Sequence, residues 1–345
     1  MDALQPGRGP IRSSTYLPAD AAQVLWGRLP CETDAPVLTV DSGAEVTIDT
    51  ISHEGILEDQ GRDPLAFFTG HGATEVLEDA IAIAASDYDR GDGGPHVITG
   101  PIFVRGAKPG GVLKMTLVEA LPRVPYGVIS NRHGRGALPG EYPRSGETVS
   151  IFAGVDGDFG TIARVADAPR DVRFPLAPFL GIMGVAVAGE ERPHSVPPGF
   201  HGGNIDIKLL TAGSSLYLPI QVEGALAYVG DPHFAQGDGE VALTALEASL
   251  RVTVRFEVLD ESPFGELSGP LVETDEFLVP TGLHEDLSEA MRRCVRASID
   301  LLKVKFDMDD EHALAYLSAA TDFDISQVVD QVSGVHAKIR KADFD

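Results

Sequence analysis

The chain has 345 residues, of which 43% are hydrophobic, enough to bury a large core in one or two domains. Its 52 acidic residues outnumber its 27 basic residues and give a formal net charge of −25. An electrostatic field of this sign repels nucleic acids and anionic membranes, so we expect neither as a partner. The negative charge is compatible with a neutral or cationic substrate or a bound metal ion. It is equally explained by a solvated acidic surface.

The N-terminal segment carries no targeting signal that we recognise. Residues 1–30 lack a basic start followed by an apolar run, and no apolar run in the chain approaches the roughly 18 residues of a membrane span. The two cysteines, Cys31 and Cys294, form neither a disulfide framework nor a Cys-x-x-Cys motif. We therefore predict a cytoplasmic protein in a reducing compartment.

Most of the chain is predicted to form β-strands. The 38 glycines and 24 prolines separate short apolar runs, a pattern typical of many strands joined by turns. Residues 35–55 and 96–121 each predict two strands around a turn, and 216–230 continues the series. In 248–259 apolar residues alternate with Arg, Thr and Glu, which predicts a half-buried strand.

Helices are expected in three places only. Residues 73–87 have apolar side chains at helical spacing, with Thr74 as a possible N-cap. Residues 284–306 trace one apolar face from Leu287 through Met291 and Cys294 to Leu302, and 309–320 predicts a second short helix. The fold class is thus mainly β, a large sandwich or barrel-like body with helices appended. We expect a body over 1–280 and a helical segment over 281–345 that packs on it as one unit.

The stretch GDPHFAQGDGE, residues 230–240, concentrates polar groups between strand-like segments. Asp231 and His233 are two positions apart, as are Asp238 and Glu240, so on an extended backbone each pair projects to one face. A carboxylate with an imidazole can ligate Zn²⁺ or a similar ion, and a second carboxylate pair can supply a general base. The alternative is a polar turn in which Asp caps backbone N–H groups.

Further polar residues lie beside glycine-rich junctions. Asn204 and Asp206 again have the i, i+2 relation and follow two glycines. Junctions at strand ends are where all-β enzymes commonly build sites, although each histidine taken alone is better explained as an ordinary polar residue. The histidines at such junctions are His53, His96, His133, His201 and His233.

Several catalytic motifs are absent from the sequence. It contains no G-x-S-x-G elbow, no Walker A sequence, no H-E-x-x-H and no Ser-Ser-Lys amidase set. Cys294 lies on the apolar face of a predicted helix, where core packing explains it better than catalysis. Metal-assisted hydrolysis by carboxylate and imidazole groups fits what remains.

Residues 194–247 resemble the signature region of the acetamidase/formamidase family. The shared pattern is Gly-Gly-Asn-x-Asp at 202–206, an apolar strand at 216–220, and Gly-Asp-x-His-x-x-Gln-Gly-Asp-Gly-Glu at 230–240. Residues 95–115 and 325–339 also resemble family segments. The resemblance implies a β-sandwich, hydrolysis of small aliphatic amides to carboxylate and ammonia, a homodimer or larger homo-oligomer, and a divalent metal.

Chemistry and spacing suggest roles within this frame. We expect Asp206, Asp231 and His233 to bind the ion, zinc before calcium or magnesium, with His53 as a further ligand. Glu240, beside Asp238, would take a proton from water and deliver it to the leaving nitrogen. Asn204 and Gln236 would orient the amide. His96 would act as a proton shuttle or as a further metal ligand.

The chain also departs from the family pattern. Many relatives carry a Cys after the Gly-Glu pair, where this chain has Ala242 and Leu243, so no thiol is required there. Residues 52–63 and 126–141 suggest a less-characterised branch, which leaves the amide open. Two alternatives stand beside the amidase: a non-catalytic β-sandwich that binds an ion or small ligand, and a hydrolase of a carbamate, ureide or amidine.

Overall fold

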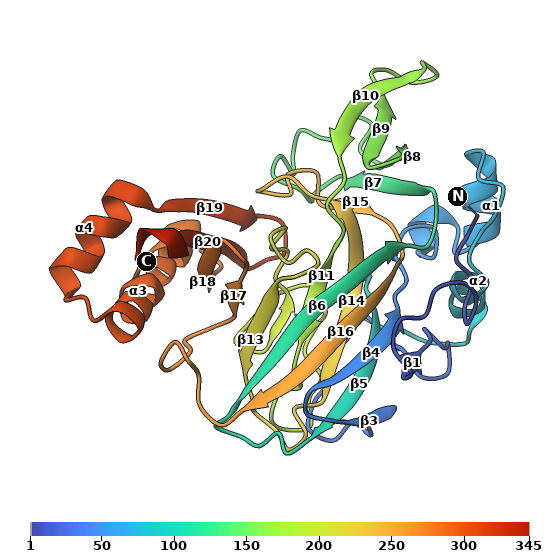
Figure 1. The fold of residues 1–345 in the computed structure, drawn as a ribbon. Coiled ribbons are helices and arrows are strands. Elements are labelled where there is room, and N and C mark those ends of the chain that lie inside the picture. Colours follow the sequence, from blue (N-terminus) through green and yellow to red (C-terminus); the bar gives the residue numbers. More distant parts are fainter. Residues whose placement is uncertain (1, 345) are drawn as a thin grey trace.

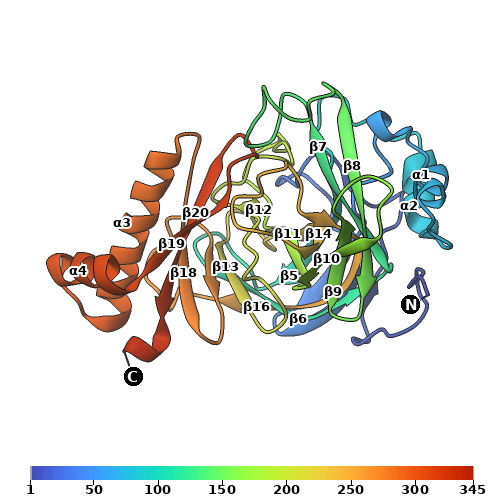
Figure 2. The same ribbon diagram turned by 90° about the horizontal axis from the view of Figure 1, so that it is seen from above.

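The computed structural model describes residues 2–344, which form two large β-sheets and a helical end (Figures 1 and 2). The first sheet has nine strands, in the order β1 (Tyr16–Leu17), β4 (Ala44–Asp49), β16 (Leu250–Leu259), β6 (Val112–Pro122), β13 (Ser215–Pro219), β17 (Leu271–Glu273), β18 (Phe277–His284), β20 (Ser333–Arg340) and β19 (Asp322–Gln327).

The second sheet has eleven strands. Eight follow one path, in the order β10 (Arg170–Pro175), β9 (Phe159–Ala163), β8 (Thr148–Asp156), β7 (Tyr126–Arg132), β15 (Leu246–Glu247), β14 (Ala227–Ala235), β11 (Phe179–Gly184) and β12 (Gly202–Asn204). The other three join at β14: β5 (Val97–Arg105), which pairs with β2 (Leu25–Trp26) and β3 (Leu38–Asp41).

One hydrophobic core joins the two sheets. Val254 and Phe256 of β16 belong to the same buried cluster as Phe179 of β11 and Val229 of β14. Burial of apolar side chains between facing sheets is what stabilises a sandwich. The predicted mainly-β sandwich with a small helical segment is therefore confirmed. Among the described residues, no helix is both long and apolar enough to cross a membrane.

The predicted strands form, but consecutive ones often belong to different sheets. The turn at Ser42 and Gly43 separates β3 from β4, which lie in opposite sheets, and the same holds for β5 and β6. The expected run over 216–230 is interrupted between β13 and β14. On β16 the inward residues are buried as predicted, but Arg251 and Thr253 are buried too, because Arg251 donates to N-terminal carbonyls of Gln5, Arg8 and Pro10 that cover this face.

The helices are shorter than predicted at their N-termini. Thr74 is not an N-cap, since α2 spans Glu78–Ala85 and starts after Leu77. Helix α3 spans Leu287–Phe306 and α4 spans Asp310–Ala320; the Asp residue before each caps it. The expected apolar face of α3 holds at Cys294 and Leu302, whereas Leu287 and Met291 are exposed. A short α1 (Pro64–Gly70) and two 3₁₀ turns, η1 (Glu58–Gln60) and η2 (Lys341–Asp343), were not predicted.

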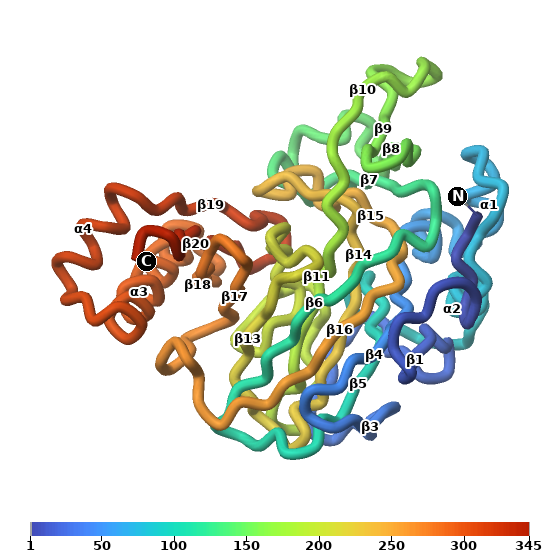
Figure 3. Tube along the Cα trace, viewed as in Figure 1, coloured from blue at the N-terminus to red at the C-terminus, as the bar shows by residue number. Residues whose placement is uncertain are grey.

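The C-terminal region is not only helical. After α4 the chain returns through β19 and β20, and β20 pairs with β18, so these strands extend the nine-stranded sheet. The predicted boundary at residue 280 falls inside β18. In Figure 3 the C-terminus lies near α3, and the N-terminus lies at the other end beside α1 and α2. Between the ends, the loop from β19 to β20 reaches back toward the sandwich.

Candidate functional site

The centre of the candidate site is β14, a strand of the eleven-stranded sheet that is buried along its length except at Ala235. Asp231 and His233 project from one side of it, as their i, i+2 spacing predicted, and His233 Nε2 lies 3.1 Å from Asp231 Oδ2. Strand pairing places Glu247 of β15 opposite His233, with Glu247 Oε1 3.0 Å from the same Nε2. Two carboxylates thus face one ring nitrogen of His233.

Loops at the sheet ends bring four more predicted residues to this point. His53, which follows β4, has Nδ1 3.4 Å from Asp231 Oδ1, and His96, which precedes β5, has Nε2 3.8 Å from the same oxygen. Asp206, just after β12, has Oδ1 3.8 Å from His233 Nδ1. Glu240 joins Asp206 and His233 in a group whose ligand atoms lie within 4.8 Å of one another. Segments distant in sequence therefore share one buried cluster.

The backbone around these acids is strained. Asp206, Asp231 and Glu240 have φ angles of 48°, 48° and 46°, in the left-handed region that residues other than glycine rarely occupy. Such conformations persist where the surrounding structure enforces them, and they concentrate at functional sites. Gly181 of β11 faces the same point, where a Cβ would overlap carboxylate oxygens of Asp206 and Asp231. The fold thus keeps space for these acids that an alanine would fill.

The charges of the cluster are poorly compensated. Asp206, Asp231, Glu240 and Glu247 are at most 7% exposed, and within residues 2–344 none of them pairs with a Lys or Arg. A buried polar atom without a partner costs on the order of 1–3 kcal/mol. The buried atoms without a hydrogen-bond partner include His53 Nδ1, both ring nitrogens of His233, both oxygens of Asp206, Asp231 Oδ1, Glu240 Oε2 and Glu247 Oε2.

The proton affinities follow from this crowding. Burial raises the pKa of Asp206 to about 7, with the charge of Asp231 adding to the effect and His233 opposing it. Burial, with the charges of Asp206 and Asp330, also raises the pKa of Glu240 well above its usual value. Burial lowers the pKa of His96 to about 4, whereas contacts with Asp231 and Glu54 outweigh burial and raise that of His53 to about 10. These carboxyls hold protons more tightly than ordinary ones unless a cation takes the protons' place.

The donor set fits a divalent cation. Three overlapping groups of buried residues have ligand atoms within 4.8 Å of one another, and Asp231 belongs to two of them. Imidazole nitrogens with carboxylate oxygens are ligands of zinc and related ions. The groups are His53 with His96 and Asp231, Asp231 with His233 and Glu247, and Asp206 with His233 and Glu240. A cation would satisfy the atoms that have no protein partner.

Three predicted residues lie beside this cluster rather than in it. Asn204 is buried on β12, with its Oδ1 unpartnered. Gln236 donates from Nε2 to the carbonyl oxygens of Asp206 and Ser326, at 2.8 and 3.2 Å, so its amide braces the backbone. Asp238 pairs with Lys208 at 2.5 Å and lies in a separate group with Asp324 and His336. Their predicted catalytic roles remain predictions.

Two acids of the cluster were not predicted from the sequence. Glu247 occupies a two-residue strand with no motif around it, and only its pairing with β14 brings it opposite His233. Asp330 comes from the β19–β20 loop, where Gln327 Oε1 accepts hydrogen bonds from the backbone N–H groups of Val329 and Asp330. Burial and the neighbouring Asp206 raise the pKa of Asp330 well above its usual value. In the sequence, Asp330 lies within the stretch 325–339 that resembles a family segment, but no role was assigned to that stretch.

Solved structures share this fold. An acetamidase from Bacillus halodurans superposes with a TM-score of 0.76 at 24% identity, over 95% of this chain and 98% of that one. A predicted acetamidase/formamidase from Thermoanaerobacter tengcongensis gives 0.75 at 25% identity, over 95% and 97%. The fold is therefore that of these structures, a class of β-sandwich with a helical end.

The sequence comparison supports the same resemblance. Residues 187–340, somewhat less than half of the chain, match the model of the Acetamidase/Formamidase family, which is the family that the sequence resembles. A formamidase from Methylophilus methylotrophus is 25% identical over 68% of this chain and 73% of its own length. An acetamidase from Mycolicibacterium smegmatis is 31% identical over 42% of this chain. The chain spans about half of that acetamidase (49%) and of a Schizosaccharomyces pombe relative (52%).

Proposed function

We propose that the protein hydrolyses a short aliphatic amide of the formamide or acetamide type to a carboxylate and ammonia. The observation that carries the proposal is the buried cluster around Asp231, whose carboxylate and imidazole atoms lack protein partners. The names of the related formamidase and acetamidase support the choice of an amide.

The cluster also supports a resident divalent cation. His53, His96, Asp206, Asp231, His233 and Glu247 would hold it, with room for two ions because Asp231 belongs to two groups. A bound divalent cation would polarise the amide carbonyl and make a coordinated water more acidic. Zinc is our first choice, because imidazole and carboxylate ligands are mixed here.

Glu240 is placed to move protons. Its carboxylate is buried against Asp206 and His233, and burial with the nearby acids raises its pKa well above the usual value. A base whose pKa is shifted toward the working pH transfers protons efficiently in both directions. Glu240 would accept a proton from the attacking water and deliver it to the leaving nitrogen. Gln236 would hold the backbone carbonyl of Asp206 in place.

The test is ammonia release from a panel of formamide, acetamide and propionamide, with the purified protein assayed before and after chelation. We expect release from at least one short amide, loss of release after chelation, and recovery with added Zn²⁺. Bound metal without ammonia release from any amide would instead favour an ion-binding protein and reject the amidase. A homodimer or larger homo-oligomer and a cytoplasmic location stay predictions.

A further inference from the structure

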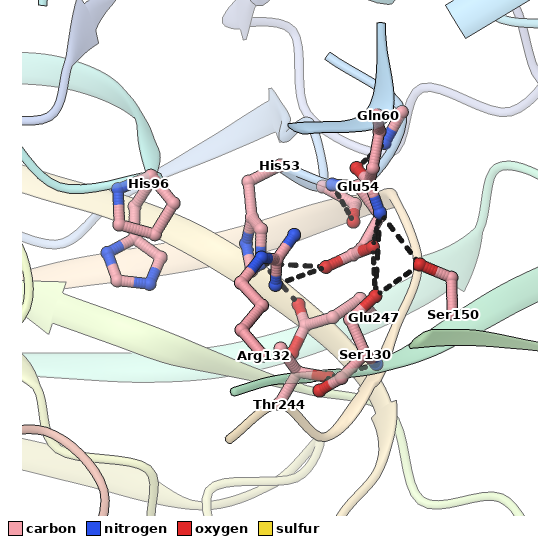
Figure 4. A network of polar contacts seen from close by, with 12 residues as sticks. His53, Glu54, Gln60, His96, Ser130, Arg132, Ser150, Thr244 and Glu247 are labelled. Carbon is pink, nitrogen blue, oxygen red and sulfur yellow. Dashed lines mark hydrogen bonds and ion pairs between the residues drawn. The ribbon is translucent and has the colours of Figure 1, made fainter. Parts of the chain in front are cut away.

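Glu54 lies beside His53 but takes no part in the groups that could hold a metal. Its Oε1 is 3.3 Å from His53 Nε2 (Figure 4). The other ring nitrogen, Nδ1, faces Asp231 Oδ1 at 3.4 Å and Glu247 Oε2 at 3.8 Å. The imidazole of His53 therefore bridges Glu54 and the cluster.

Glu54 is itself held in place by a polar network. Its Oε2 accepts hydrogen bonds from Ser130 Oγ of β7, at 2.5 Å, and from Gln60 Nε2, and Arg132 Nη1 lies 3.3 Å from its Oε1. Ser130 and Ser150 are hydrogen-bonded in turn at 2.9 Å (Figure 4). The Glu54 side chain is fully buried, so these partners fix both its position and its negative charge. Such a carboxylate stays charged and can accept a hydrogen bond from Nε2–H of His53.

The two faces of His53 are unequal. Nε2 meets a carboxylate whose other contacts are complete, whereas Nδ1 is a buried atom without a hydrogen-bond partner that faces only carboxylate oxygens. A neutral imidazole carries one proton, and the hydrogen bond at one nitrogen decides which nitrogen is left with a lone pair. With Nε2–H directed at Glu54, Nδ1 has a lone pair beside Asp231 once its own proton is released, and a divalent cation would satisfy both atoms.

We infer that Glu54 is a positioning residue that sets the tautomer and orientation of His53, so that Nδ1 and Asp231 Oδ1 present themselves together to one divalent cation. The inference rests on the metal of the proposed function. Carboxylates that orient a metal-binding histidine in this way commonly change metal affinity 10- to 100-fold when they are mutated. Glu54 touches neither the amide nor the cation.

The experiment compares Zn²⁺ affinity in wild type, Glu54→Gln and a matched control, by competition with a chromophoric chelator. The control is Asp59→Asn, which removes an acid that also binds Arg132, at 2.7 Å, but does not contact His53. We expect affinity to fall about 10- to 100-fold in Glu54→Gln and less than about threefold in Asp59→Asn. Equal affinity of Glu54→Gln and wild type would overturn the inference.

Two further measurements keep the inference testable if Glu54→Gln fails to fold. Ser130→Ala removes one hydrogen bond that holds Glu54 and leaves His53 untouched, so we expect a smaller but measurable loss of Zn²⁺ affinity. In the wild type, ¹⁵N NMR of metal-loaded protein should show His53 protonated at Nε2; protonation at Nδ1 would overturn the inference. A wild type that releases ammonia but binds no divalent ion would reject the inference while leaving the amidase standing.

Discussion

Two buried ionic clusters of this molecule use their charges in opposite ways. In the nine-stranded sheet, Asp49 Oδ1 accepts from Arg251 Nε at 2.6 Å, and Asp49 Oδ2 accepts from Arg251 Nη2 and the Tyr16 hydroxyl at 2.9 and 2.6 Å. Around Asp231, by contrast, the four buried acids have imidazoles as their only basic neighbours within residues 2–344, and most of their ligand atoms lack partners.

The difference separates structure from function. The Asp49–Arg251 pair compensates its own desolvation and fastens the N-terminal segment to β16. The Asp231 cluster keeps like charges together on a strained backbone, which lowers the stability of the metal-free fold. A fold retains such a cluster when a ligand or a reaction makes use of it. We therefore expect substitutions at Asp49 or Arg251 to change stability, and substitutions in the Asp231 cluster to change activity.

The largest expected effect is that of Asp231→Asn. Asp231 belongs to two of the possible metal groups, so its loss should reduce ammonia release to the background rate and remove bound metal. Elemental analysis and the amide assay measure the two outcomes. Wild-type activity in Asp231→Asn would contradict the placement of the site.

Glu240→Gln should lower the turnover number about 10²- to 10⁴-fold, the usual contribution of a positioned general base. Because we assign Glu240 to proton transfer, Zn²⁺ should remain bound at the wild-type stoichiometry. Steady-state kinetics and metal analysis on the same preparation separate the two roles. Undiminished turnover would remove the base assignment.

Arg251→Met tests the other cluster. The substitution takes the bidentate partner from the fully buried Asp49, to which Arg123 at 3.5 Å and the Tyr16 hydroxyl remain as neighbours, so the free energy of unfolding should fall by about 3 kcal/mol. Chemical denaturation measures this loss. Specific activity per folded molecule should remain that of the wild type, since neither residue contacts the Asp231 cluster; a selective loss of activity without destabilisation would break the contrast between the two clusters.

Asp206→Asn should flatten the pH dependence of stability in the metal-free protein. Burial raises the pKa of Asp206 from its usual 3.8 to about 7, so between these values the folded state holds a proton that the unfolded state has lost. Stability therefore falls as the pH rises through this window. Thermal midpoints with a chelator present, between pH 4 and 7, should decline less steeply in Asp206→Asn, and identical slopes would argue against a buried, proton-retaining Asp206.

The smallest effect is expected at Asp238. It pairs with Lys208 at a partly exposed position, with side chains 23% and 37% accessible, and such pairs contribute about 0–1 kcal/mol. Asp238→Asn should therefore change activity less than about tenfold. A loss as large as that of Glu240→Gln would instead support the catalytic role that the sequence suggested for Asp238.

The sequence predicted best those parts of the site in which two residues meet because of their spacing along a single strand. Asp231 and His233 meet because alternate residues of an extended strand share a face, and this needs no knowledge of the rest of the fold. His53, His96, Asp206 and Glu240 lie at strand ends beside glycines, which marked them as candidates without stating which of them would meet. Their convergence depends on how the two sheets close, which local patterns do not encode.

The residues that were missed depend on long-range pairing. Glu247 reaches the cluster through the register of β15 against β14, and Asp330 through a loop between two strands that were expected to be part of a helical tail. Conversely, Asp238 had the same i, i+2 spacing to Glu240 as Asp231 has to His233, but it lies past the end of β14, where alternation no longer holds. Spacing therefore predicts a shared face only inside a strand.

The contribution of the β19–β20 loop has a consequence for how the molecule is made. Gly239 N–H donates to the carbonyl of Ser326, and Gln327 holds the loop that carries Asp330 toward Asp206. During synthesis the strands up to β16 leave the ribosome before residue 330, so Asp206, Asp231 and Glu240 are made before the loop that carries Asp330. A growing polypeptide therefore cannot complete the Asp231 cluster with Asp330 until translation has passed residue 330.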